Sequence, residues 1–151
     1  MKLNVKIGFC LLLLASLVTC KKDNNFPDEP QIEVRDFYKE SNLIAIWKIG
    51  FTDGDGDIGV RNPADKDNFI VTIFSIVDGV AESQPGQSYR IPVVENIRTA
   101  AGIEGEFEFE IETDLLRLDS IPIDSAYYRA YVIDRSDNAS NIVETPIFTT
   151  N

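Results

Sequence analysis

The chain has 151 residues, with 14 basic against 25 acidic side chains and a net charge of −11. So acidic a protein repels the phosphate backbone, which excludes nucleic acid as a partner. There is no histidine and there are only two cysteines. This argues against zinc, copper and iron sites and against Ser-His or Cys-His nucleophiles.

The N-terminus reads as a secretory signal peptide. Lys2 and Lys6 precede an apolar run over residues 7–18, which is too short to span a bilayer. We therefore predict that residues 1–19 are a signal peptide and that residues 31–151 form one domain. Removal of the signal peptide would leave 12 basic against 25 acidic residues, a net charge of −13.

The end of the apolar run has a more specific pattern. Leu17-Val18-Thr19-Cys20 resembles a lipobox, although Thr19 stands where that motif usually has Gly, Ala or Ser. The resemblance implies a covalent lipid on Cys20 and cleavage just before it. Residues 20–30 are polar and hold two prolines, which predicts a flexible tether. The start CKKD is similar to that of many Bacteroidota outer-membrane lipoproteins, which implies an anchor in the outer membrane. The resemblance does not decide whether the protein lies on the periplasmic or the outer face of that membrane.

The remaining sequence predicts strands. Alternating or continuous apolar patterns mark residues 31–38, 42–51, 68–77, 105–113, 125–134 and 141–150, with a weaker strand at 88–94. A single helical turn is predicted at 114–118, and Asp78-Gly79 is a turn signal. About seven strands without a helix of normal length predict an all-β immunoglobulin-like sandwich. Its aromatic core is expected to hold the residues Trp47, Phe69, Phe74, Phe107 and Phe109.

Residues 51–60 read FTDGDGDIGV and place Asp53, Asp55 and Asp57 at alternate positions. Carboxylates in a glycine-rich loop suit a hard cation, above all calcium, which takes six to eight oxygen ligands in flexible geometry. The loop is not an EF-hand. Counting from Asp53 puts Ile58 where glycine is required, and counting from Phe51 puts a phenylalanine at the first ligand position.

Other acids are candidates to complete this site. They lie in two other stretches, and they are Asp65, Asp67, Asp134 and Asp137. Loops at one end of an immunoglobulin-like sandwich lie close together, so these carboxylates could meet the first three. The alternative is a glycine-rich turn whose aspartates accept backbone amide hydrogen bonds and remain solvated.

The 51–59 loop and the ending Asp134-Arg-Ser-Asp-Asn-Ala-Ser-Asn-Ile-Val-Glu-Thr-Pro-Ile147 together resemble a group of small Bacteroidota outer-membrane lipoproteins. These have an FxDGDGDIG loop and a DRAGNxSNxVxTPxI ending, and the second motif is similar to a loop of immunoglobulin-like and cadherin-like modules. In this chain Ser136-Asp137 replaces the usual Ala-Gly. The resemblance implies an envelope location and an immunoglobulin-like fold, and no substrate.

Three functions compete at this point. The first is a lipid-anchored binding or structural module of the outer membrane, stabilised by calcium, with an envelope protein or a glycan as partner. The second is a glycan-binding accessory lipoprotein of a polysaccharide uptake system, which needs exposed aromatic side chains. The third is an envelope hydrolase, which the missing histidine and thiol disfavour; we therefore predict that the protein is not an enzyme.

Overall fold

The computed structural model describes residues 26–41, 43–62, 65–93, 98–99, 101–113, 123 and 125–149. The predicted signal peptide, Cys20 and the predicted helical turn at 114–118 lie outside these residues. The strands are β1 (Gln31–Lys39), β2 (Ile44–Asp53), β3 (Phe69–Val77), β4 (Val80–Gln84), β5 (Ser88–Tyr89), β6 (Arg98–Thr99), β7 (Gly102–Glu112), β8 (Ser125–Val132), β9 (Val143–Glu144) and β10 (Phe148–Thr149).

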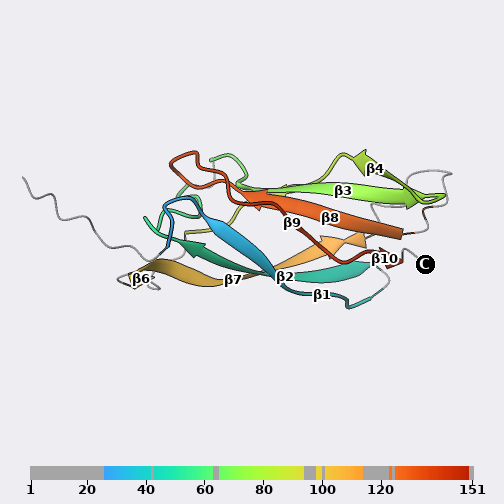
Figure 1. Cartoon of the computed structure of the whole chain (residues 1–151), viewed down its shortest axis with the longest axis horizontal. Coiled ribbons are helices and arrows are strands. Elements are labelled where there is room, and N and C mark those ends of the chain that lie inside the picture. Colours follow the sequence, from blue (N-terminus) through green and yellow to red (C-terminus); the bar gives the residue numbers. More distant parts are fainter. Residues whose placement is uncertain are drawn as a thin grey trace, which may run out of the picture.

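Two antiparallel sheets pack face to face (Figure 1). One has the order β1-β2-β7-β6, and the other has β10-β8-β3-β4, with β5 also paired to β3 and β9 to β8. This is the strand order of an immunoglobulin-like sandwich, in which strands A, B, E and D face strands G, F and C with an added C′ strand. The all-β sandwich predicted from the sequence is confirmed, with more strands than the seven expected.

The additional strands are short or exposed. β4 follows the predicted Asp78-Gly79 turn, in which both residues have positive φ, as a type I′ hairpin turn requires. Its side chains are almost all exposed, so no apolar alternation marks it in the sequence. β6 has two residues and is too short to produce a pattern.

The core lies between the sheets and is rich in aromatic rings. Trp47, Phe69 and Tyr128 are fully buried, and the Trp47 ring lies 5.9 Å from that of Phe69 and 6.3 Å from that of Tyr128. Trp47 on β2 and Tyr128 on β8 occupy the two strands that antibody domains join by a disulfide. In this protein a contact between aromatic rings joins these two strands.

One predicted core residue lies elsewhere. Phe74 points away from the core, because alternate residues of β3 face opposite sides of the sheet and only one side is covered. It stacks on Tyr127 of β8 with ring centroids 4.8 Å apart, and the Arg129 guanidinium lies 4.8 Å from its centroid. The prediction that Phe74 belongs to the core is therefore wrong. Phe107 and Phe109 pack against the core as half-buried side chains.

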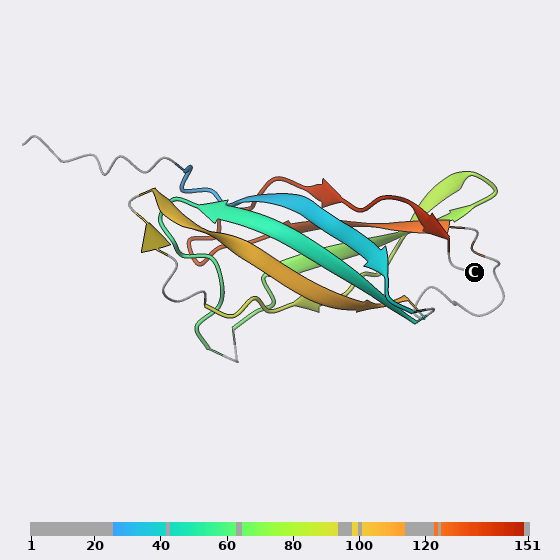
Figure 2. The same ribbon diagram turned by 90° about the horizontal axis from the view of Figure 1, so that it is seen from below.

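The two ends of the sandwich differ. At the loop end, defined by residues 54–62, 65–68 and 133–142, the chain connects β2 to β3 and β8 to β9. The hairpin end holds residues 40–41, 43 and 78–79, together with the last described residue, Thr149 (Figures 1 and 2). Because Phe26 hydrogen-bonds Ala101 beside the start of β7, the described chain enters the sandwich at the loop end.

Candidate metal centre

The aspartate loop begins with a buried cap. Asp53 is the last residue of β2 and is 0% exposed. Its Oδ2 accepts hydrogen bonds from the amides of Asp57 (2.8 Å) and Ile58 (2.6 Å), and its Oδ1 accepts one from Gly56 (3.2 Å). One carboxylate thus holds three successive amides and reverses the chain direction after the strand, with Gly56 at a positive φ of 73°.

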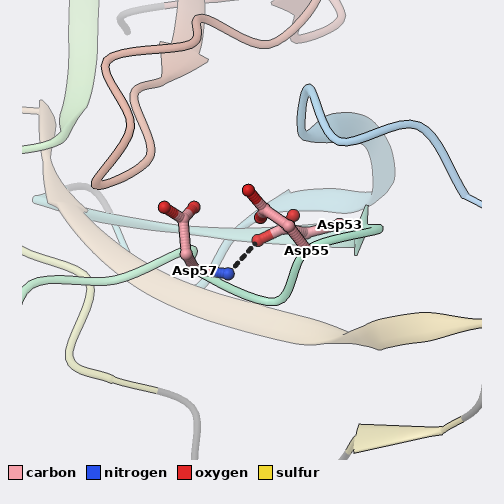
Figure 3. Close-up of side chains that lie close together, drawn as sticks. All are labelled: Asp53, Asp55 and Asp57. Carbon is pink, nitrogen blue, oxygen red and sulfur yellow. Dashed lines mark hydrogen bonds between the residues drawn. The ribbon is translucent and has the colours of Figure 1, made fainter. Parts of the chain in front are cut away.

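This turn brings the three carboxyl groups together. One oxygen from each of Asp53, Asp55 and Asp57 lies within 4.8 Å of the other two, and the side chains rise on the same side of the loop (Figure 3). Asp57 Oδ2 accepts a hydrogen bond from Ser136 Oγ at 2.8 Å. Asp57 Oδ1 is buried without a hydrogen-bond partner among the described residues, so an acceptor inside the group has lone pairs to offer.

The electrostatics of the group are unfavourable for a third negative charge. Burial raises the pKa of the Asp55 carboxyl to about 7, helped by its hydrogen bond with Asp53 and by the charges of Asp57, Asp53 and Asp134. At neutral pH this carboxyl is therefore close to half protonated. A divalent cation bound between the three groups would replace that proton, because a nearby positive charge favours the ionised form of each carboxyl.

A second buried aspartate organises the loop after β8. Asp134 is 5% exposed; its Oδ1 accepts the amides of Ser136 (2.9 Å) and Asn138 (2.7 Å), and its Oδ2 accepts Asn138 Nδ2 (2.9 Å). Its oxygens are not in the three-aspartate group. Asp134 therefore caps its own loop and acts on Asp55 through its charge.

Arg135 joins the two loops. Its Nη1 donates hydrogen bonds to the carbonyls of Gly59 (2.8 Å) and Ile58 (3.3 Å), and its backbone amide donates to Asp57 O at 3.4 Å. The Arg135 guanidinium thus binds backbone carbonyls of the aspartate loop and leaves its carboxyl groups to one another. The two acidic loops lie against each other, as the sequence predicted.

The remaining candidate ligands have other partners or positions. Asp65 Oδ2 accepts the Asn62 amide at 2.9 Å, and Asp67 Oδ1 pairs with Arg90 Nε at 3.1 Å. Asp137 is exposed and has a positive φ of 65°. These three residues line an open groove of about 710 Å³ beside the three-aspartate group, together with the basic residues Lys66 and Arg135. None of them belongs to the group.

Sequence reasoning missed the polar residues that hold this end together. Asn68 is buried; its Oδ1 accepts the Ile91 amide at 2.8 Å and its Nδ2 donates to Ile133 O at 3.3 Å. Asn141 forms two 2.8 Å hydrogen bonds with the backbone of Ile32 on the edge strand β1. For Asn141 the only signal was the concentration of Asn and Ser in the ending motif, and no pattern in the sequence marked Asn68.

The chain was compared with models of protein families, with curated proteins and with solved structures, and none of them matches it. Among the described residues, no helix has the length and the apolar character needed to cross a membrane.

Proposed function

We propose that this protein is a lipid-anchored immunoglobulin-like module of the outer membrane that serves a binding or structural role rather than catalysis. The aspartate loop, residues 53–57, would bind a hard divalent cation, with calcium as the first candidate. The observation that carries the cation is the convergence of three carboxylate oxygens within 4.8 Å. The anchor is supported by the signal peptide pattern and the lipobox-like Leu17–Cys20.

The chemistry of the group supports calcium more than other metals. All three side chains are carboxylates, and calcium prefers oxygen ligands in an irregular, flexible shell, whereas magnesium requires a tight octahedron. The buried Oδ1 of Asp57 supplies a lone pair that no protein donor uses among the described residues. Three carboxylates fall short of six to eight ligands, so water would complete the shell of the ion.

The cation is tested by melting the mature chain with Cys20→Ser, which keeps it soluble, in EDTA and in calcium. For a site of extracellular strength, with Kd about 10⁻⁴–10⁻³ M, 10 mM calcium should stabilise the fold by about 1.4–2.7 kcal/mol. The double variant Asp55→Asn/Asp57→Asn should lose this gain, while Asp65→Asn should retain it. An equal calcium shift in the double variant would place the ion elsewhere, and no shift at all would sink the cation proposal.

The anchor needs a separate measurement. The full chain, made in a bacterial host that processes lipoproteins, should appear in the membrane fraction with acyl chains on Cys20, as mass spectrometry of the N-terminal peptide would show. The Cys20→Ser variant should leave the membrane fraction. Membrane association that survives this substitution would contradict the proposal.

Glycan binding is the second candidate, and one observation favours it. Phe74 and Tyr127 stack on the outer face of the second sheet, where Tyr131 also lies on the same side of β8. Such outward rings are the side chains that carbohydrate sites use. We rank it second because the two rings already cover one face of each other. Affinity electrophoresis in polysaccharide gels tests it: retardation that Tyr127→Ala abolishes would support it, and unchanged mobility in every polysaccharide would dismiss it.

A further inference from the structure

Residues 26–30, here named the strap, lie against the loop end of the sandwich. The amide of Phe26 donates to Ala101 O at 3.3 Å, and Gly54 N donates to Pro27 O at 2.7 Å. Pro30 at the end of the strap is fully buried. The sequence assigned these residues to a flexible tether, but here they contact the domain, so the folded part of the described chain begins at Phe26.

The strap lies directly on the aspartate loop. A Cβ atom built on Gly54 would be 2.3 Å from the carbonyl oxygen of Phe26 and 2.6 Å from that of Pro27. Real Cβ atoms do not approach backbone this closely, so only glycine fits between Asp53 and Asp55 while the strap is in place. The glycine is thus explained by the strap as well as by the turn.

The strap fixes where the proposed lipid anchor leaves the domain. Six peptide steps separate Cys20 from Phe26, and six steps span no more than about 22 Å in any conformation. The hairpin end lies at the far end of β7, an 11-residue strand that is about 36 Å long. The anchor therefore keeps the strap, and with it the loop end, within about 22 Å of the lipidated cysteine. The hairpin end can lie farther from the lipid by the length of β7.

We propose that the loop end is the surface of the domain that faces the membrane, and that the hairpin end points away from it. The partner of this surface is the lipid headgroup layer that holds the acyl chains of Cys20, so the inference rests on the proposed lipid anchor. The exposed carboxylates of Asp65, Asp67 and Asp137 then face the headgroups, and the hairpin end is presented to other envelope molecules.

The test measures which end lies near the lipid. In the processed lipoprotein the Cys20 thiol carries the lipid and Cys10 is removed, so a single added cysteine can be labelled with a fluorophore. Lys66→Cys marks the loop end, and Val80→Cys, at a residue 60% exposed, marks the hairpin end. In vesicles with headgroup-labelled acceptor lipid, energy transfer from the loop-end label should be at least about twofold larger, given the ~36 Å separation along the strands.

Equal transfer from the two labels, or larger transfer from Val80→Cys, would overturn the orientation while leaving the anchor intact. A chain without acyl groups on Cys20 would overturn the anchor, and the orientation with it. The strap is tested by Gly54→Ala, whose Cβ displaces it, with Asp65→Ala as a matched control at the same end. Gly54→Ala should reduce the difference between the labels and Asp65→Ala should not; an unchanged difference in Gly54→Ala would overturn the role of the strap.

Discussion

The two loops that meet at one end of the sandwich start alike and then differ. Each begins with a buried aspartate at or just after the end of a strand, Asp53 in the first loop and Asp134 in the second. The carboxylate of each aspartate accepts hydrogen bonds from three N–H groups of its own loop. In the second loop the residues that follow supply a guanidinium, Arg135, an amide, Asn138, and one exposed acid, Asp137. In the first loop they supply Asp55 and Asp57, which add charge beside the cap.

The comparison distinguishes the one carboxylate that each turn requires from the additional carboxylates of the first loop. One buried carboxylate satisfies the amides of a tight turn, as the second loop demonstrates with a single acid in that role. In the first loop Asp53 alone accepts the amides of Gly56, Asp57 and Ile58. Asp55 and Asp57 add carboxyl groups beside this cap, where burial and the neighbouring carboxylates raise the pKa of Asp55. This surplus is the strongest structural reason to expect a cation at the first loop, and the following substitutions test it.

The largest effect is expected from removing the caps. Asp134→Ala leaves three N–H groups at the loop end without their acceptor, which should lower the free energy of unfolding by about 3 kcal/mol. Asp53→Ala also leaves three N–H groups without their acceptor, but it relieves repulsion with Asp55 and Asp57. In EDTA it should therefore cost less than Asp134→Ala. Urea unfolding measures both, and an equal or larger cost for Asp53→Ala would show that the repulsion is unimportant.

Separating the loops should cost less. Arg135→Lys retains the charge but loses the planar fork that donates to the carbonyls of Ile58 and Gly59. We expect a loss of about 1–2 kcal/mol in the free energy of unfolding. Arg35→Lys, at an exposed arginine that pairs with Glu33 on β1, is the matched control and should cost well under 1 kcal/mol. Equal losses would mean that Arg135 does not join the loops.

The pH dependence follows from the raised pKa of Asp55. A carboxyl whose pKa is about 7 in the folded protein and near 4 in the unfolded chain binds its proton more tightly when folded. The fold therefore loses stability as pH rises from about 4 to about 7, and in EDTA the Tm should be a few degrees lower at pH 8 than at pH 5. Asp55→Asn should flatten this trend. A Tm that rises over the same interval in EDTA would contradict the assignment.

Strand patterns predicted most of the fold because burial imposes them. The alternation in β7 and the continuous apolar run of β2 both arise from the core, and both strands were found. The strap was missed because it is held by backbone hydrogen bonds of Phe26 and Gly54, which require no particular side chain at 26. Likewise, the sequence showed three aspartates at alternate positions. Only the structure distinguishes Asp53, which caps the turn, from Asp55, whose pKa is raised.

The smallest expected effect concerns the turn residue of the second loop. Asp137 has a φ of 65°, in the left-handed region that glycine enters without steric cost and aspartate only with some. Asp137 therefore holds this turn geometry with a residue that is less suited to it than glycine. Asp137→Gly should raise the free energy of unfolding by up to about 1 kcal/mol and leave the calcium response of the first loop unchanged. A weaker calcium response in this variant, measured by the same melting experiment, would instead make Asp137 a ligand, and the second loop would then share the function of the first.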